Sequence, residues 1–219
     1  MIERAEIFIL SNESCMDFIE SFDNSSDFIS ELQKKYDYIE AYHGTNLSSK
    51  ELSDFYKNGF TKATKDFLWE KAISRFVCEN DNSELKEKIR NEIGSYFSNF
   101  ENESASEFWF GLSKIDLLER NYHYVLFGSE VLLPLASRLK NKFNIQFKQR
   151  LIDSGSHLII SVSVPVEQVE IQWLECLYEY HMSGHCETSL LIKNEVPLNW
   201  ISKIEFVEKP IDYQNIVIN

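Results

Sequence analysis

The segment 157–164 constrains the fold of this chain more than any other stretch of the sequence. Its residues are His-Leu-Ile-Ile-Ser-Val-Ser-Val, and Pro165 follows directly. A short run rich in β-branched residues favours a strand, and proline cannot continue the hydrogen-bonding ladder of a central strand. We therefore expect a β-sheet that contains 157–164, and we expect Pro165 to end this strand and to open a turn or a helix.

The other predicted elements follow from apolar periodicity and from helix-capping residues. Five further segments are strand candidates, namely 5–10, 36–43, 122–128, 188–193 and 201–207. The first of these also fits a helix start, and Gly44-Thr45-Asn46 would end the second. Helical spacing covers 13–35, 47–58, 64–78, 83–98 and the stretch from Ser129 to about Leu139. The first range has a break near 23–26, where Ser26 would cap a second helix. The helix at 47–58 would be capped by Ser48 or Ser49 and ended by Gly59. Residues 99–107 are expected to form a loop.

The order of these elements predicts an α+β fold, with a helix-rich first half and a strand-rich second half. The 219 residues suit a single domain, 1–219, and 43% of them are hydrophobic, which is enough for a sizeable core. Glycine and proline are scarce, with 7 and 4 residues, so we expect regular elements joined by modest loops.

Charge and cysteine usage narrow the function classes. The formal net charge is −13, and so acidic a surface repels the phosphates of nucleic acids on average. A basic protein partner or a small molecule fits this charge better than general nucleic-acid binding. Four scattered cysteines without a CxxC pair predict reduced thiols. No secretory signal and no long apolar run is visible, so we expect a cytoplasmic protein without a membrane partner.

The first candidate site is the segment Tyr42-His43-Gly44-Thr45. A strand that ends in these residues presents an imidazole to a cleft, a glycine whose backbone a ligand can approach closely, and a hydroxyl that can reach a ribose. Taken alone, the tripeptide His-Gly-Thr is more commonly a turn glycine beside a partly buried histidine.

Two later segments also present chemically useful groups. In 122–130, an aromatic strand with Tyr124 runs into a helix start, where backbone N–H groups can meet a ligand. The alternative is that Ser129 and Glu130 only cap the helix. In the third segment, Glu187 stands at the head of an apolar strand, where it is either a solvated acid or a carboxylate aimed at a cleft.

The order of these segments resembles the ADP-ribosyltransferase superfamily. It is most similar to the His-Tyr-Glu branch, which includes the poly(ADP-ribose) polymerase, diphtheria-toxin and tRNA 2′-phosphotransferase groups. The resemblance covers about 36–208, apart from a long helical insert near 64–120. It implies a split β-sheet core and an NAD-dependent transfer of ADP-ribose with release of nicotinamide.

The resemblance implies a role for each matched residue of the first segment. His43 would bond the ribose on the adenosine side of NAD. Gly44 would hold the nicotinamide carboxamide through its backbone, and Thr45 would assist nearby. NAD is thereby the expected substrate, and no metal is expected.

The later segments would supply the stacking group and the carboxylate. Tyr124 would stack on the nicotinamide ring, with Phe127 as the alternative in another register and Ser129 lining the site in a divergent branch. Glu187 is preferred over Glu175, and it would bond the nicotinamide ribose and stabilise the positive charge that grows on the sugar.

Enzymes of this kind resemble toxins of toxin–antitoxin or anti-phage modules, which implies a protein or nucleic-acid acceptor and a restraining partner protein. Two clusters have simpler explanations. His181, His185 and Cys186 lack a fourth zinc ligand and are expected in a loop before Glu187, where the histidines could touch substrate. The basic cluster is expected to be a solvated helix end and consists of Lys140, Lys142, Lys148 and Arg150.

Two other functions stay open at this stage. The fold could be kept without its chemistry, as a module that binds a nucleotide or a partner protein. The chain could also be a helical interaction protein in which His-Gly-Thr occurs by chance.

Overall fold

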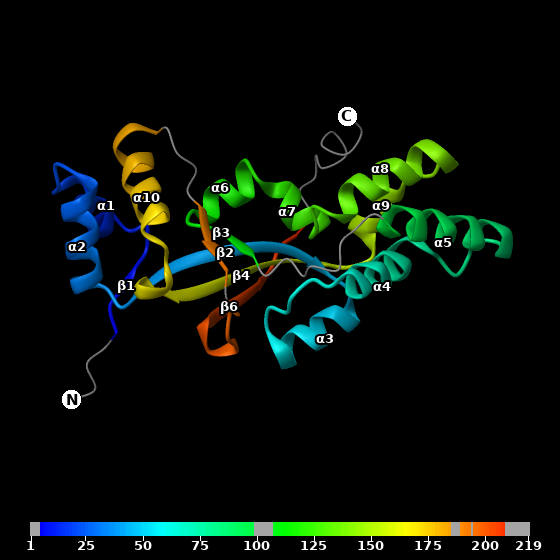
Figure 1. Ribbon diagram of the computed structural model, residues 1–219, viewed down its shortest axis with the longest axis horizontal. Helices are drawn as coiled ribbons and strands as arrows, with labels where there is room; N and C mark the ends of the chain where they lie inside the picture. Colours follow the sequence, from blue (N-terminus) through cyan, green and yellow to red (C-terminus); the bar gives the residue numbers. More distant parts are fainter. Residues whose placement is uncertain (1–4, 99–106, 185–188, 194, 209–219) are drawn as a thin grey trace. The chain divides into compact units, whose positions relative to one another are not determined.

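The structure is a computed structural model that describes residues 5–98, 107–184, 189–193 and 195–208 (Figure 1). Contacts between residues divide the chain into two compact units. The first unit comprises the described residues up to His43 together with Glu107–Asn121 and Ile159–Glu205. The second comprises the described parts of Gly44–Ser106, Tyr122–Leu158 and Phe206–Asn219. The division falls within strands β2 (Tyr38–Leu47) and β4 (Ser156–Pro165), so each unit holds part of both strands.

The class is α+β, as the sequence predicts. In the described residues the strands are β1 (Ile7–Phe8), β2, β3 (Phe108–Gly111), β4, β5 (Ser189–Ile192) and β6 (Ile201–Phe206). They form one sheet in the order β5-β3-β2-β4-β6, and β1 pairs with β2 outside this path. β1 runs parallel to β2, whereas the pairs β2–β3 and β3–β5 are antiparallel.

Helices flank the strands in both units. Those of the first unit are α1 (Glu13–Glu20), α2 (Ser25–Lys35), α6 (Lys114–Glu119) and α10 (Ile171–Ser183), with 3₁₀ turns at Val166–Gln168 and Leu198–Trp200. Those of the second unit are α3 (Ser49–Asn58), α4 (Lys65–Phe76), α5 (Ser83–Ser98), α7 (Tyr122–Phe127), α8 (Leu132–Phe143) and α9 (Phe147–Asp153). None of the helices in the described part of the chain is long and apolar enough to cross a membrane.

In the first unit, α10 packs against α1, α2 and β5 (Figure 1). The helical spacing of Phe28 and Leu32 puts both on the buried face of α2. The ring of Phe28 lies 5.6 Å from that of Tyr178 on α10, and the Tyr178 hydroxyl donates a 2.9 Å hydrogen bond to the carbonyl of Phe22. The α1–α2–α10 cluster is thus held by aromatic packing and by a satisfied buried phenol.

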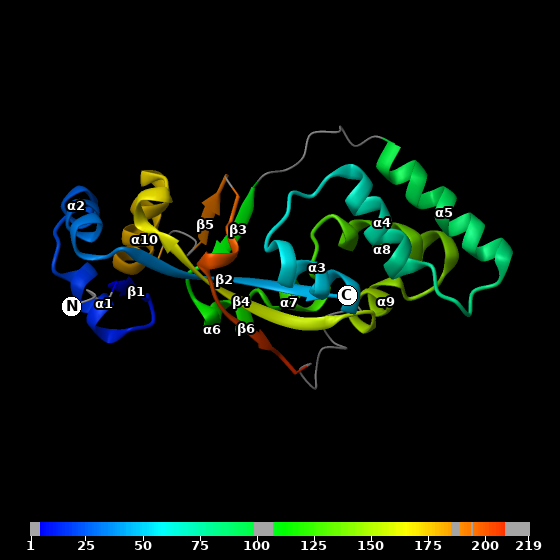
Figure 2. The same cartoon turned by 90° about the horizontal axis from the view of Figure 1, so that it is seen from below.

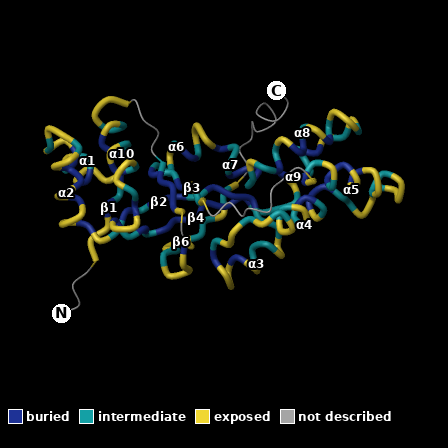
Figure 3. The backbone as a smooth tube through the Cα atoms, in the orientation of Figure 1, coloured by how far each residue is buried: buried dark blue, intermediate teal, exposed yellow. Residues whose placement is uncertain are grey.

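In the second unit, α4 packs against α5 and α9, and α8 packs against α5 and α9 (Figure 2). Helix α3 is bounded as expected. The Ser48 hydroxyl and the Glu51 carboxylate form a capping box at its start, and Gly59 ends it with φ 66°, a conformation that favours glycine. The buried positions along β2 and β4 are seen in Figure 3.

The predicted strand at 122–128 is wrong, because these residues form helix α7. Tyrosine, valine and phenylalanine favour strands locally. Here Tyr122, Val125 and Leu126 are buried at i, i+3 and i+4, the spacing of one helix face, and α7 packs on α9. Tertiary packing therefore overrides the local preference.

Several predicted boundaries also shift. β2 does not end at Gly44 but continues to Leu47. Asn24, not Ser26, caps α2, because its side chain accepts the Asp27 N–H at 3.0 Å. Helix α8 begins at Leu132 rather than at Ser129, although the Ser129 hydroxyl still accepts the Leu132 N–H.

The distribution of elements differs from the expectation as well. The second half of the chain is not mainly strands, since α7, α8, α9 and α10 lie in it. The segment 64–120 is not helical throughout, because it contains β3. His181 lies in the last turn of α10 rather than in a loop. Most of the predicted loop at 99–107 falls outside the described residues.

Candidate functional site

The ring of His43 is fixed in the first unit by strand β3. Its Nδ1 lies 2.9 Å from the backbone carbonyl of Trp109, and its ring centroid lies 5.6 Å from that of Phe110. A carbonyl oxygen can only accept, so Nδ1 carries the proton of this hydrogen bond. In the neutral imidazole, Nε2 is then the acceptor nitrogen.

Strand β3 lies between the strand that carries His43 and the strand that follows Glu187 in sequence. Tyr42 pairs with Gly111, and Gly111 pairs with Ser189, so β2, β3 and β5 share one row of residues. Glu187 itself lies outside the described residues and precedes Ser189 by two positions. In the first unit, two of the three expected strands, β2 and β5, are thus separated by one aromatic strand, β3, that the sequence analysis missed.

That missed strand reads Phe-Trp-Phe-Gly over Phe108–Gly111. Its central rings differ sharply in exposure: Phe110 is 1% exposed, and Trp109 is 48% exposed. The Trp109 ring packs edge-on against Trp173 of α10 with centroids 5.2 Å apart. Since side chains alternate along a strand, Phe110 lies on the His43 side of β3 and Trp109 on the other side. Three consecutive aromatic residues before a glycine are the signal that could have revealed this strand.

Tyr124, Phe127 and Ser129 belong to the second unit, where local contacts account for each of them. The Tyr124 hydroxyl donates to Glu130 Oε1 at 2.8 Å, and its ring lies 4.1 Å from that of His123. Phe127 is 5% exposed in the core. The Ser129 hydroxyl accepts a backbone N–H of α8, which fits the helix-capping interpretation.

Gly44 and Thr45 are buried within β2, as is the next residue, Asn46. Burial of a backbone segment within a strand commits its polar groups to the sheet ladder. The Thr45 side chain is 5% exposed. These positions are therefore part of a continuous strand interior rather than of a turn.

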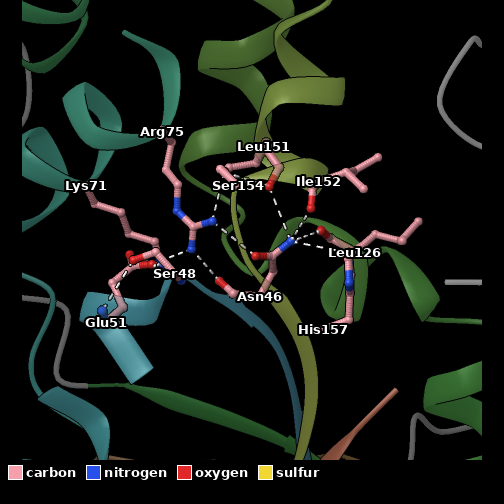
Figure 4. A network of polar contacts seen from close by, with 10 residues as sticks. All are labelled: Asn46, Ser48, Glu51, Lys71, Arg75, Leu126, Leu151, Ile152, Ser154 and His157. Atoms are coloured by element: carbon pink, nitrogen blue, oxygen red, sulfur yellow. Dashed lines mark hydrogen bonds and ion pairs between the residues drawn. The ribbon is translucent and has the colours of Figure 1, made fainter. Parts of the chain in front are cut away.

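The most extensive polar arrangement of the second unit surrounds Asn46 (Figure 4). The Asn46 side-chain amide donates to the carbonyls of Leu126 at 2.7 Å, Leu151 at 3.2 Å and Ile152 at 3.2 Å. These carbonyls belong to the ends of α7 and α9, where helices lack internal partners. One amide therefore caps two helices. His157 Nε2 lies 3.4 Å from the same nitrogen.

Arg75 of α4 closes the other side of this network. Its Nη1 donates to Asn46 Oδ1 at 3.1 Å and to the Ser154 hydroxyl at 2.9 Å, and its Nη2 donates to the Asn46 carbonyl at 2.9 Å. Nη2 also forms an ion pair with Glu51. The Arg75 side chain is 1% exposed, so these bonds replace its hydration almost completely.

Glu51 joins this arginine to Lys71, whose Nζ lies 3.3 Å from Glu51 Oε1. Burial by itself raises the pKa of Glu51, but the charges of Lys71 and Arg75 and a hydrogen bond from Ser48 outweigh burial and hold the pKa below its ordinary value. Burial lowers the pKa of Lys71, and the charge of Arg75 adds to this, while Glu51 opposes it.

The remaining predicted clusters are structural or lie partly outside the described chain. Among the described residues, no group of three or more His, Cys, Asp and Glu side chains is arranged to hold a metal ion. His185 and Cys186 fall outside the described ranges, and His181 contacts Glu20 at 3.1 Å. In the basic cluster, Arg150 is not a solvated helix end, because it forms a two-pronged pair with Asp81 at 2.7 Å.

Comparison with known proteins adds no family to these observations: no protein-family model, curated protein or solved structure matches the chain significantly. Its function has to be argued from its own residues.

Proposed function

We propose that this protein is an NAD-dependent ADP-ribosyltransferase that transfers ADP-ribose to a protein or nucleic-acid acceptor and releases nicotinamide. The observation that carries the proposal is the order of three strands in the first unit. β3 stands between β2, which holds His43, and β5, which begins two residues after Glu187. One aromatic strand thus separates the strand of the predicted histidine from the strand that follows the predicted carboxylate in sequence.

The fixed orientation of the His43 ring supports a sugar-binding role. Its Nδ1 donates to the Trp109 carbonyl, and imidazole nitrogens are suitable hydrogen-bonding partners for ribose hydroxyl groups. The carbonyl also fixes the orientation of the ring, so little rotational freedom is lost when a ligand binds.

The stacking role stays with Tyr124, as the resemblance implies. The ring of Trp109 is exposed, but it lies on the face of β3 opposite to His43 and packs on Trp173. Phe110 lies on the His43 side of β3, but it is buried. A tyrosine ring offers a flat apolar face to the nicotinamide ring.

In this reaction the main contribution of the protein is a negative charge placed close to the reacting sugar. The bond between the ribose carbon C1′ and the nicotinamide nitrogen breaks, and its electron pair leaves with nicotinamide as a neutral molecule. The sugar becomes oxocarbenium-like, and the carboxylate of Glu187 would stabilise this charge until a nucleophile of the acceptor bonds to C1′ and loses its proton.

The test is nicotinamide release from NAD by the purified protein with cell lysate as the acceptor pool. We expect Glu187→Gln to abolish release. We expect Tyr124→Ala to raise KM for NAD roughly tenfold or more, since stacking on an aromatic ring contributes about 1–3 kcal/mol. Trp109→Ala, on the face of β3 away from His43, is the matched aromatic control, and its KM should stay near that of the unaltered protein.

The outcome also identifies the acceptor. Label that disappears with protease indicates a protein, and label that disappears with nuclease indicates a nucleic acid. If no nicotinamide is released but NAD raises the melting temperature, the chain is an inactive binding module. If NAD has neither effect, the proposal is wrong.

The cellular role that we propose is that of a cytoplasmic toxin or phage-defence effector restrained by a partner protein. The net charge of −13 favours a protein acceptor over nucleic acid, because the average field of the surface repels phosphates.

A further inference from the structure

Two cations of the second unit share one carboxylate. Lys71 and Arg75 are four residues apart on α4, so both side chains leave the same face of the helix, and both reach Glu51 (Figure 4). Their side chains are 9% and 1% exposed. With one carboxylate against two cations, the cluster carries one excess positive charge in a nearly dry environment, although the whole chain is strongly acidic.

Some hydrogen-bond donors of the cluster are not used within the described residues. Arg75 uses both terminal nitrogens, but its Nε is buried and has no partner among the described residues. Lys71 Nζ contacts Glu51 Oε1 at 3.3 Å. An ammonium group has three donors, so this single contact leaves the donor capacity of Lys71 largely unused.

The start of α3 adds to the positive potential at this place. Ser48 caps this ten-residue helix, and Glu51 stands in its first turn. The first N–H groups of a helix and its dipole favour an anion near that end. The negative charge of Glu51 offsets part of this positive potential, but the same carboxylate also pairs with Lys71 and Arg75.

We propose that the Lys71–Arg75 cluster binds a phosphate-type oxyanion. A tetrahedral oxyanion supplies several acceptor atoms and a negative charge, so it can take donors from Lys71 Nζ and Arg75 Nε while it neutralises the excess charge. The phosphate could be inorganic or the terminal group of a nucleotide. The site belongs to the second unit and does not depend on the transferase proposal.

Thermal unfolding of the full chain in inorganic phosphate, compared with chloride at equal ionic strength, tests this site. We expect the melting temperature to rise with the logarithm of phosphate concentration. Lys71→Met, which keeps the length of the side chain and removes its charge, should abolish the rise. Lys57→Met, at an exposed position of α3, is the matched control and should keep it.

A binding measurement covers the case in which Lys71→Met fails to fold. Phosphorus NMR of inorganic phosphate with the unaltered protein should show broadening that Lys71→Arg preserves. ADP in place of phosphate separates the two sources: tighter binding of ADP assigns the site to a nucleotide phosphate, and equal or weaker binding assigns it to the free ion. The proposal is wrong if inorganic phosphate causes neither line broadening nor a phosphate-specific rise in melting temperature.

Discussion

Replacement of Asn46 by alanine is the perturbation whose effect the structure specifies best. The amide of this fully buried side chain donates to the carbonyls of Leu126, Leu151 and Ile152, and its oxygen accepts from Arg75. The substitution by alanine removes all of these hydrogen bonds and leaves their partner groups in place. Because the three carbonyls end α7 and α9, no helical N–H is placed to replace the amide.

The size of the effect follows from the groups left without a partner. The Leu151 carbonyl keeps a bond from the Ser154 hydroxyl, and Arg75 Nη1 keeps the same hydroxyl as acceptor. The carbonyls of Leu126 and Ile152 have no other hydrogen bond among the described residues. A buried unsatisfied group costs about 1–3 kcal/mol, so two of them predict a loss of about 2–6 kcal/mol, nearer the lower end if water enters the vacated space.

Urea unfolding followed by far-UV circular dichroism measures this loss. The matched control is Asn91→Ala on the exposed face of α5, for which we expect a change within about 0.5 kcal/mol. A decrease for Asn46→Ala that is no larger than that of the control would refute the reasoning that this amide caps two helices.

Two further substitutions test the packing and the electrostatics of the same unit. Gly155→Ala should lower the free energy of unfolding by about 1–3 kcal/mol, because a Cβ there would meet Asn46 Oδ1 at 1.9 Å. Gly94→Ala is the matched control, because a Cβ there has no atom within 4 Å and should stabilise the helix by about 0.5–1 kcal/mol. Equal urea midpoints for the two variants would contradict this reasoning. The hydrogen bonds from Arg150 hold the pKa of Asp81 below its ordinary value, so the ion pair stabilises the folded state above the ordinary carboxyl pKa of about 3.9 and is lost as the pH falls through the lowered pKa. Asp81→Asn should therefore be less stable at neutral pH, and its deficit should shrink as the pH falls below about 4, a trend that urea midpoints on both sides of this pH would confirm or exclude.

Local patterns in the sequence were sufficient for several elements. The strand over 157–164 was predicted from its β-branched run and from Pro165, and it is confirmed as β4. Helix α3 was predicted with its cap at Ser48 or Ser49, of which the structure shows Ser48, and with its end at Gly59, because capping groups act on backbone atoms only a few residues away. The histidine segment was also correctly placed on a strand.

Prediction from the sequence failed for elements whose secondary structure depends on residues far away in the chain. Residues 122–127 have strand-forming side chains, but their burial against α9 selects a helix. β3 is only four residues long, and its hydrogen bonds come from β2 and β5, about 70–80 residues away in either direction. No local pattern could therefore show that His43 bonds the Trp109 carbonyl.

The sequence alone determined which segments can form strands and helices and which residue types could carry NAD chemistry. Only the tertiary structure decided that β3, rather than the segment that contains Tyr124, pairs with the histidine strand, and that Asn46, Glu51, Lys71 and Arg75 form one network. The physical reason is that hydrogen bonds and ion pairs in a low-dielectric interior depend on positions in space, which the chain acquires only when its apolar faces pack.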